Sequence, residues 1–415
     1  MKILFLTDNF PPETNAPATR TYEHARSWVA AGHQVTVLAN VPNFPTGKVF
    51  PGYRNRFWQR EIMDGIRVVR VWTYVTANEG FLRRSLDYFS FAVTGVIGGL
   101  FLPRPDVIVA TSPQIFTALA GCLLAWIKRR PFVFELRDLW PDSIVAVGAM
   151  GEGPLLRMLR RLEYWLYHRA AKIISVTNAF KRVLVANGVP QEKIAVIRNG
   201  VDLKAFVPGP KPVQLARRLG MKGKFVAAYV GTIGMAHGLD TLLSAAERLR
   251  HRKDLAFVLV GTGAERTRLE EDGKRRGLEN VVFVGPVSKE EVKQYWRLCD
   301  VALVLLKDVP LFLHVIPSKM FEAMGTGRPI ILGVRGESQE LLQEAVAGIV
   351  IPPENPQALA EAITKVMDNP SLCRDMGVAG RKFVEAKFDR QRLALDMLKV
   401  LEETVEPRCG TEARA

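Results

Sequence analysis

The stretch Leu203-Lys204-Ala205-Phe206-Val207-Pro208-Gly209-Pro210-Lys211-Pro212 places three prolines and one glycine within ten residues. This composition interrupts helices and strands and is typical of a boundary between domains. On both sides of it, short apolar strands alternate with helical segments, an order that predicts parallel sheets covered by helices on both faces. We therefore predict two doubly wound α/β domains, of residues 1–207 and 208–385. A last helix at about residues 386–405 is expected to pack back on the first domain.

The expected strands are short and mostly apolar. Before the boundary they are Lys2–Thr7, Gln34–Ala39, Val107–Ala110, Phe132–Glu135 and Lys172–Val176. After it they are Phe225–Val230, Ala256–Val260, Val281–Val284, Val301–Leu306 and Pro329–Leu332. A helix is expected over Thr19–Ala31, ended by Gly32. Ligands of open α/β sheets bind beyond the carboxyl ends of the strands, so two such domains that face each other across a cleft are expected to share one site.

Length and composition fit this prediction. The chain has 415 residues, of which 48% are apolar, enough for two cores and far from the profile of a disordered chain. The apolar run at the N-terminus is too short for a signal peptide. The cysteines are scattered singly, which argues against zinc and against disulfides and favours a reducing, cytoplasmic location. They are Cys122, Cys299, Cys373 and Cys409.

The net charge of +15 indicates an anionic partner. Nucleic acid is not expected, because the sequence has no basic tail, RNA-binding aromatic motif or zinc finger. A membrane surface is the other candidate, since two very apolar stretches, 89–102 and 115–127, lie among basic residues, and each falls short of the ~20 residues that a spanning helix needs. They are either two buried helices or an interfacial surface held on anionic lipid. The basic residues are Arg54, Arg56, Arg60, Arg67, Arg70, Arg83, Arg84, Lys128, Arg129, Arg130, Arg157, Arg160, Arg161 and Arg169.

Two glycine-rich turns of the second half are suited to a phosphorylated ligand. They are Val230–Gly238, which contains Thr232 and His237, and Val260–Glu265, which contains Gly263. Glycine lets backbone amides approach phosphate oxygens, and His237 could add a hydrogen-bond donor. Glycine is also the usual residue of any tight turn, so either turn alone leaves a purely structural role open.

The segment Val315–Met324 predicts a helix start with more specific chemistry. Ser318 is expected to cap the helix, and Lys319 lies in its first turn beside the unpaired amides. A departing nucleoside diphosphate needs its negative charge stabilised, and a helix N-terminus with one lysine can do so. Glu322, one turn later, can accept hydrogen bonds from both hydroxyls of a ribose. The alternative is that Ser318 and Glu322 are only a cap and a solvated helix residue.

Taken in combination and in order, several segments resemble the retaining glycosyltransferases of family 4, which have the GT-B fold of two Rossmann-like domains facing across a cleft. The resemblance runs from end to end. It rests on Pro11-Pro12-Glu13 after the first strand, on Ala31–Val37, on Arg198–Asp202, on Phe321–Ile330 and on Glu340 with Ala347–Val350. The Pro-Ser-Lys turn at 317–319 and the segment Asp138–Asp142 are similar to the amino-deoxysugar transferases of bacterial surface-polysaccharide assembly, which builds O-antigen and capsule.

The resemblance implies roles for the residues of the donor site. Glu322 takes the place of the second glutamate of the family's E-x7-E motif, which binds the ribose. The first glutamate falls on His314, so this sequence departs from the pattern where the family contacts the transferred sugar. The family's arginine and lysine for the diphosphate fall on Thr232 and His237, which carry no fixed charge, and Lys319 is expected to replace them and to act in catalysis. The nucleotide-sugar-binding set also includes Gly263, Ser318 and Glu340.

The acceptor is expected on the first domain. Where the family often has a histidine followed by an aspartate at the end of a strand, this chain has Arg137 and Asp138. We expect Asp138 to act on the acceptor hydroxyl and Arg137 to hold an acceptor diphosphate, although the strand end could instead be a plain salt-bridged structure. The loop Thr14–Arg20 replaces a glycine-rich loop of many relatives, and its amides, with Asn15 and Arg20, are expected to face the donor phosphates or the acceptor.

The resemblance further implies retaining transfer, by front-face departure and attack, from a nucleoside-diphosphate sugar, with UDP as the expected nucleotide. The acceptor is expected to be a glycan linked to polyprenyl diphosphate, at the inner face of the cytoplasmic membrane. No D-x-D follows a strand, so neither a catalytic metal nor another cofactor is expected.

Three alternatives stay open. The first two are a catalytically silent sugar-nucleotide-binding partner protein and a non-hydrolysing nucleotide-sugar epimerase. The third, a nicotinamide-dependent oxidoreductase, is disfavoured because Asp8–Pro12 stands where its G-x-G-x-x-G should follow the first strand.

Overall fold

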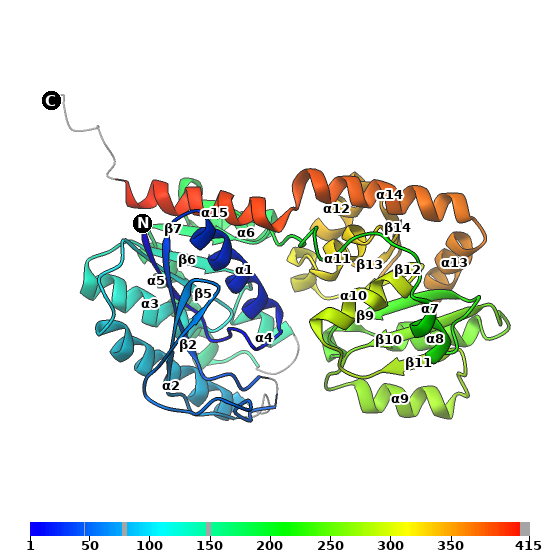
Figure 1. Cartoon of the computed structure of the whole chain (residues 1–415), viewed down its shortest axis with the longest axis horizontal. Coiled ribbons are helices and arrows are strands. Elements are labelled where there is room, and N and C mark those ends of the chain that lie inside the picture. Colours follow the sequence, from blue (N-terminus) through cyan, green and yellow to red (C-terminus); the bar gives the residue numbers. More distant parts are fainter. Residues whose placement is uncertain (45, 77–80, 147–150, 407–415) are drawn as a thin grey trace. The chain divides into compact units, whose positions relative to one another are not determined.

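The computed structural model describes residues 1–44, 46–76, 81–146 and 151–406, and it divides the chain into two compact units, each built round one sheet (Figure 1). The first unit is Met1–Arg198 together with the C-terminal segment that starts at Gln391, and the second is Asn199–Arg390. The division therefore lies before the expected boundary at residue 207. Residues 199–207 stay with the second unit because Arg381 donates hydrogen bonds to the carbonyls of Leu203 and Phe206, at 3.4 and 2.6 Å.

The first unit has an eight-stranded sheet in which only the two strands at one edge are antiparallel. The apolar strands that the sequence predicts lie in its interior, buried on both faces, which accounts for their continuous apolar sequence. The spatial order is β3 (Gln59–Met63), β4 (Ile66–Val71), β2 (Gln34–Asn40), β1 (Lys2–Leu6), β5 (Val107–Thr111), β6 (Phe132–Leu136), β7 (Lys172–Ser175) and β8 (Ile194–Val196).

The antiparallel edge, β3 and β4, is a hairpin that the sequence analysis missed. Its turn is Asp64-Gly65, with φ angles of 46° and 79°. Aspartate followed by glycine is a strong hairpin signal, because such a turn needs positive φ at both residues. β3 itself alternates half-buried and exposed positions and begins Gln59-Arg60-Glu61, so it lacks the apolar run by which the other strands are recognised.

Helices cover both faces of this sheet. α1 (Ala16–Ala30) connects β1 to β2, whereas α2 (Phe81–Leu100), α3 (Ile115–Lys128) and α5 (Pro154–Arg169) connect strands that succeed one another in the opposite direction. Because such crossovers are right-handed, α1 lies on one face and the other three lie on the opposite face. α15 (Arg390–Val405) packs on α1, where Trp28 Nε1 donates to the carbonyl of Ala394 at 2.7 Å. The unit also contains α4 (Asp142–Ala146), α6 (Asn178–Ala186) and the 3₁₀ turn η1 (Gln191–Lys193).

α1 begins earlier than the sequence predicts. Asn15 caps it, because its Oδ1 accepts a hydrogen bond from the amide of Ala18 at 3.0 Å, and Pro17 lies in the first turn, where a missing N–H costs nothing. The prediction of a loop over Thr14–Arg20 is therefore wrong for residues 16–20, which are helical, and that their amides face a ligand stays a prediction.

The two apolar stretches at 89–102 and 115–127 fall mainly in α2 and α3. Each helix buries one side, through residues such as Phe91 and Leu124, and exposes large apolar side chains such as Ile97 and Trp126 on the other. A fully buried pair of helices is thus not what the chain forms. Within the described residues, no helix is long and apolar enough to cross a membrane.

The second unit has a six-stranded parallel sheet. Its order is β11 (Val281–Val284), β10 (Leu255–Val260), β9 (Phe225–Val230), β12 (Val301–Leu305), β13 (Ile330–Gly333) and β14 (Gly348–Val350). The chain order reverses between β9 and β12, so the carboxyl ends of these two strands form the switch point at which open α/β sheets bind ligands. The helices and 3₁₀ turns are α7 (Val213–Arg218), η2 (Met235–His237), α8 (Asp240–Arg248), α9 (Arg266–Arg275), α10 (Lys289–Leu298), η3 (Pro310–His314), α11 (Lys319–Gly325), α12 (Glu337–Ala345), α13 (Pro356–Met367) and α14 (Pro370–Lys387).

Candidate functional site

Lys319 lies at the switch point of the second unit. Its Nζ is 3.7 Å from the ring centroid of Tyr229, the next-to-last residue of β9. A Cβ on Gly231 would lie 3.1 Å from the same nitrogen, so glycine at this position leaves room for the ammonium group. The structure therefore brings Lys319 together with the first glycine-rich turn.

The amino group of Lys319 is buried and has no hydrogen-bond partner among the described residues. Burial lowers its pKa from the ordinary 10.5 to about 7, although the carboxylate of Glu322 acts in the opposite direction. A buried ammonium without acceptors is costly, and an anion placed beside it would remove that cost. This is the clearest indication of an anionic ligand in the second unit.

His237 lies beside Lys319 but supplies no positive charge. Its ring centroid is 5.7 Å from that of Tyr229, and its Nδ1 is 3.4 Å from the carbonyl oxygen of Leu305. Burial, and next the charge of Lys319, lower the pKa of His237 to about 3, so its imidazole is neutral at pH 7. Thr232 is exposed, and its carbonyl accepts a hydrogen bond from the Tyr229 hydroxyl at 2.6 Å. Neither position carries the cation that the family usually has there.

The second glycine-rich turn owes its glycines to backbone packing. A Cβ on Gly261 would lie 2.1 Å from the carbonyl oxygen of Gly231, and one on Gly263 would lie 2.2 Å from that of Ile233. The two turns also pair directly, because the amide of Ile233 donates to the carbonyl of Thr262 at 2.9 Å. A structural role therefore accounts for Gly263, and its contact with a phosphate stays a prediction.

The expected capping of α11 by Ser318 is wrong. Ser318 has φ −58° and ψ −26°, a helical conformation, and its side chain makes no capping hydrogen bond, for which an extended backbone is typical. Its hydroxyl instead accepts a hydrogen bond from Asn199 Nδ2 at 3.4 Å. Two segments that carry the family resemblance, Arg198–Asp202 and the start of α11, meet at this contact.

Glu322 is held by an aromatic side chain that the sequence analysis did not single out. Trp296 of α10 is fully buried, and its Nε1 donates to Glu322 Oε2 at 3.0 Å. Glu322 is half-buried, so it is more than a solvated helix residue. A tryptophan at an apolar position of a helix looks like any core residue in the sequence, which is why Trp296 gave no signal.

His314 and Glu340 come from elements that pack on each other. His314 ends η3, which contacts α12, and the Ser338 hydroxyl of α12 donates to the carbonyl of Val315. Glu340 is exposed in the first turn of α12, whereas Glu337 of the same turn is buried. Glu337, which the sequence analysis passed over, is therefore the more enclosed carboxylate at this helix start.

In the first unit, Arg137 and Asp138 follow β6 directly. The hydroxyl of Ser112, just beyond β5, accepts hydrogen bonds from the amides of Arg137 and Asp138, at 2.8 and 3.3 Å. Burial raises the pKa of Asp138 to about 6, in opposition to hydrogen bonds from the Ser143 side chain and the Leu139 backbone. Asp138 is thus mostly ionised at pH 7 with a pKa not far below it, as suits a general base.

Arg20 is part of the scaffold of this unit. Its buried guanidinium donates to Glu135 Oε1 at 2.8 Å and to the carbonyls of Ile197 and Arg198 at 3.0 Å each. Burial alone would raise the pKa of Glu135, but the charges of Arg20 and Arg137 outweigh it and lower that pKa. The alternative of a salt-bridged strand end therefore describes Arg20 and Glu135, and a ligand contact by Arg20 stays a prediction.

Arg137 and Asn15 both reach the start of α1. The Nη1 of Arg137 donates to the carbonyl of Pro17 at 3.3 Å, and Asn15 caps the helix while its Nδ2 donates to Asn9 Oδ1. Two of the predicted acceptor-binding residues are therefore close neighbours in the first unit.

A polar cluster that the sequence analysis missed lies beyond the carboxyl end of β1. Asp8 is buried, and its carboxylate accepts hydrogen bonds from the side-chain amides of Asn9, Asn40 and Gln114, at 3.2, 3.1 and 3.2 Å. Burial, and next the neighbouring Asp87, raise the pKa of Asp8 well above its ordinary value. A signal was present, because Asp8 follows β1 and Asn40 ends β2 at the sheet edge where ligands bind.

Two family models match the chain. The Glycosyl transferase 4-like domain matches residues 15–200, and Glycosyl transferases group 1 matches residues 214–383, so together they cover most of both units. Named relatives extend this match. WcaI of Escherichia coli, which bears the name of a colanic acid biosynthesis glycosyl transferase, is 26% identical over 405 residues, 95% of this chain and 98% of WcaI. The glycosyltransferase WbjE of Pseudomonas aeruginosa is 25% identical over 64% of this chain and 67% of its own length.

Solved structures agree on the fold. HepE of Anabaena in complex with UDP-glucose aligns with a TM-score of 0.72 at 19% identity, over 97% of this chain and 100% of HepE. Sucrose-phosphate synthase from Thermosynechococcus elongatus aligns with a TM-score of 0.77 at 19% identity, over 97% of this chain and 98% of the synthase. The chain therefore belongs to the group 1 glycosyltransferases, family 4, which transfer a sugar from a nucleotide sugar, and it has the GT-B fold.

Proposed function

We propose that this enzyme is a retaining, metal-independent transferase that moves a sugar from a UDP-sugar to a glycan carried on polyprenyl diphosphate, during assembly of a bacterial cell-surface polysaccharide. UDP is favoured because HepE was solved with UDP-glucose. A surface polysaccharide is favoured because WcaI bears a colanic acid biosynthesis name. In this proposal the enzyme is cytoplasmic and works at the inner face of the cytoplasmic membrane.

The buried Lys319 ammonium is the observation that carries the proposal. It has no hydrogen-bond partner among the described residues, and it lies at the switch point against Gly231 and Tyr229. A leaving diphosphate gains negative charge as the glycosidic bond breaks, and a preorganised cation at that place stabilises the transition state. In this role Lys319 replaces the two cations that are absent at Thr232 and His237.

The other proposed roles follow from geometry within each unit. Glu322, with one oxygen fixed by Trp296, accepts hydrogen bonds from the ribose. Asp138, whose pKa burial raises to about 6, accepts the proton of the acceptor hydroxyl, and Arg137 binds the acceptor diphosphate. No side chain of the protein serves as a nucleophile in this scheme, so the configuration is retained by departure and attack on the same face of the sugar.

A two-stage experiment tests the proposal. A library of nucleotide sugars is first screened by thermal shift, because a bound donor stabilises the folded state by mass action. The best donor is then supplied in radiolabelled form with membranes as a source of acceptor, and lipid-extractable product is counted. We expect a UDP-sugar to stabilise the protein and to label the lipid fraction. Stabilisation without product under all conditions would favour the silent binding partner, and interconversion of the donor's sugar would favour the epimerase.

A further inference from the structure

Helix α2 of the first unit exposes an apolar stripe from Leu86 to its last residue, Leu100. The exposed residues are Leu86, Phe89, Val93, Ile97 and Leu100, which succeed one another at steps of three or four and therefore lie on one side of the helix. Phe101 continues the stripe directly after the helix. Residues 86–100 of a helix extend about 22 Å, so the stripe covers most of α2.

The neighbouring helices widen this stripe into a surface. α2 packs on α3, and α3 packs on α5. Phe89 of α2 and Phe116 of α3 meet edge to face with ring centroids 6.0 Å apart. Beyond them α3 exposes Leu123, Trp126 and Ile127, and α5 exposes Leu155, Met158 and Trp165. We call this surface the α2–α3–α5 face.

The second unit has no comparable surface in its described residues. Its exposed large apolar side chains stand singly on different elements, and single exposed apolar residues are ordinary. They are Val213, Met235, Leu313, Val346 and Val378. The α2–α3–α5 face, by contrast, gathers 12 of the 22 exposed large apolar side chains of the described chain. Concentration of this kind marks an interaction surface.

The charges exposed on the three helices themselves have a single sign. The exposed charged residues of α2, α3 and α5 are all basic, and the acidic residues of these helices, Asp87 and Glu163, are buried. More cations gather where α2 and α3 end, because Arg104 Nε donates to the Lys128 carbonyl at 3.0 Å and Lys128 Nζ donates to the Leu102 carbonyl at 2.8 Å. The margin of the face where α2 and α3 end is therefore cationic, whereas near the start of α5 Arg160 is paired with Asp142 and Glu152.

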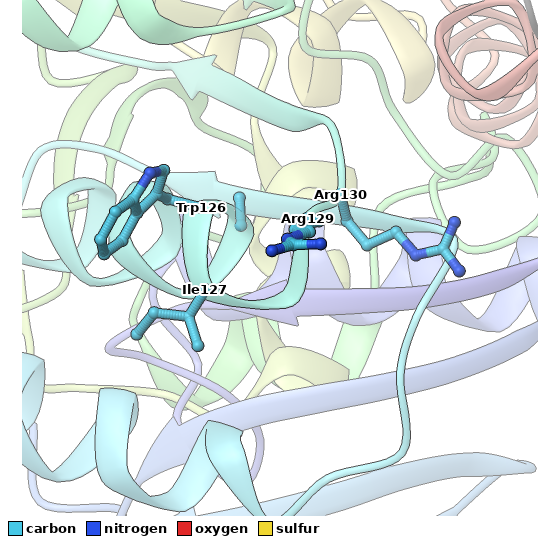
Figure 2. A pocket seen from close by; sticks show the side chains of 5 residues that line it. Trp126, Ile127, Arg129 and Arg130 are labelled. Atoms are coloured by element: carbon cyan, nitrogen blue, oxygen red, sulfur yellow. The ribbon is translucent and has the colours of Figure 1, made fainter.

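A hollow lies at this cationic margin. It has a volume of about 610 Å³ and is lined by Ala125, Trp126, Ile127, Arg129 and Arg130. Figure 2 shows the side chains of Trp126 and Ile127 on one side of it and that of Arg130 extending away on the other. The Nε of Arg130 is buried and has no hydrogen-bond partner among the described residues. The hollow thus joins an apolar wall to two guanidinium groups, and the Nε of one of them, Arg130, is unpaired in the described part of the chain.

We infer that the α2–α3–α5 face docks on an anionic phospholipid bilayer, with its aromatic and aliphatic side chains at the boundary between headgroups and acyl chains and with lipid phosphates bound by Arg129 and Arg130. Amphipathic surfaces bind bilayers in this way, through buried apolar area and attraction to anionic lipid. A second copy of the chain would set like charges against each other on this face, and an acidic protein groove would not need so broad an apolar surface. The inference rests on the proposed function in one respect only, namely that docking on a bilayer would give the enzyme access to a lipid-linked acceptor.

Vesicle flotation tests the inference. The full chain, without donor, is mixed with vesicles of phosphatidylcholine alone or enriched in phosphatidylglycerol. We expect flotation with phosphatidylglycerol, a steep loss of binding as salt rises, and little binding to phosphatidylcholine. Brominated lipid should quench the tryptophan fluorescence, and the quenching should fall in Trp126→Phe.

Two pairs of variants provide matched controls. Ile97→Glu places a charge on the face at a position in the last turn of α2 that is 52% exposed, and Val378→Glu places one at a 55% exposed position of α14. Arg129→Gln with Arg130→Gln removes two charges at the hollow, and Lys274→Gln with Arg275→Gln removes two on α9. We expect Ile97→Glu and the Arg129–Arg130 double variant to lose flotation, and Val378→Glu and the Lys274–Arg275 double variant to keep it. At about fivefold per charge, the loss of both arginines should weaken vesicle binding roughly 25-fold. Circular dichroism and thermal unfolding check that all four fold.

The outcomes separate this inference from the proposed function. Equal flotation of face and control variants, or binding to phosphatidylcholine that ignores salt, would overturn it. A dimer that these substitutions dissociate, without vesicle binding, would assign the face to a second copy instead. Donor-induced thermal stabilisation is measured on the same samples. If no nucleotide sugar stabilises the parent chain, the proposed function is contradicted. If the donor stabilises the parent chain but the parent chain does not float with anionic vesicles, only the bilayer inference is contradicted.

Discussion

Replacing Lys319 by methionine removes the buried ammonium while keeping most of the side-chain volume. In the free protein the pKa of Lys319 is lowered to about 7, so at pH 8 roughly one molecule in ten carries the charge. A diphosphate beside the amino group favours the charged form and raises this pKa again. Donor binding at pH 8 should therefore take up about 0.9 proton per molecule, and the donor affinity should fall by up to about tenfold for each pH unit above 7.

Calorimetry measures this proton uptake directly. Donor titrations at pH 8 in two buffers of different ionisation enthalpy give apparent enthalpies whose difference reports the number of protons. Lys319→Met should abolish the uptake and flatten the pH dependence of affinity, whereas Lys274→Met, at an exposed position of α9, should change neither. His237→Ala should also leave most of the uptake in place, because burial and Lys319 hold the pKa of His237 at about 3.

Kinetics provide the second measurement on the same variant. The charge of Lys319 is expected to act more strongly in the transition state than in the ground state, so kcat should fall by about two to three orders of magnitude, with a smaller change in donor affinity. Unfolding separates this effect from misfolding. An unfolded lysine keeps its proton up to pH 10.5, so the cost of burying Lys319 is largest below pH 7 and fades as pH rises toward 10.5, and Lys319→Met should be at least as stable as the parent at pH 7. A near-normal kcat in Lys319→Met, together with loss of activity in Arg198→Met or His237→Ala, would show that the phosphate site has been assigned to the wrong residue.

Three further predictions concern Asp138, Glu322 and Glu163. Asp138→Asn should lower transfer by about two orders of magnitude at unchanged donor affinity and should remove an acidic limb with an apparent pKa near 6 from the pH profile of kcat/KM; a limb that persists would assign it to another group. Glu322→Ala should weaken donor binding by about 1–3 kcal/mol for each ribose hydroxyl left unpaired, and an unchanged calorimetric affinity would contradict the ribose contact. Burial raises the pKa of Glu163 to about 8, so the folded chain holds a proton that the unfolded chain loses near pH 4.5. The free energy of unfolding of the parent, measured in urea, should therefore fall from pH 5 to pH 8 by at most about 1.4 kcal/mol per pH unit. Glu163→Gln should remove this pH dependence.

The architecture could be predicted because its strands are short apolar runs separated by helices, and because the proline-rich stretch at 203–212 interrupts both. The hairpin β3–β4 was not predicted, because its edge strand Gln59–Met63 is solvated on one side and carries polar residues. The turn residues Asp64-Gly65 were the signal that could have indicated it. Pattern gives the existence of an element more reliably than its ends. α1 started before its expected first residue because Asn15, rather than a residue nearer Thr19, provides the cap.

Buried aromatic side chains that contact a charged group were the hardest residues to predict. Tyr229 and Trp296 sit in apolar segments where an aromatic residue is unremarkable, and only the folded chain shows that one lies under an ammonium and the other holds a carboxylate. Arg20 shows the opposite error, because it was expected to face a ligand, whereas its guanidinium donates to Glu135 and to two backbone carbonyls. Ser318 was assigned as a cap from its residue type, but capping depends on the backbone angles that only the structure gives.

The departures from the family pattern at Thr232 and His237 are physically coupled to Lys319 in the proposed donor site. Like charges within a few ångströms disfavour each other, so a fixed cation at position 237 would lower the pKa of Lys319 further than burial alone does. A neutral His237 and an uncharged Thr232 leave Lys319 as the charge that a diphosphate meets in this turn of the described chain. The proposed diphosphate-binding cation of this enzyme therefore differs from the family's usual cations in its chemistry as well as in its position. A guanidinium is charged at every accessible pH, whereas a buried lysine with a pKa near 7 gains its charge when the diphosphate arrives, and this enzyme should therefore bind its donor less tightly as pH rises above neutrality, where relatives with fixed cations should not.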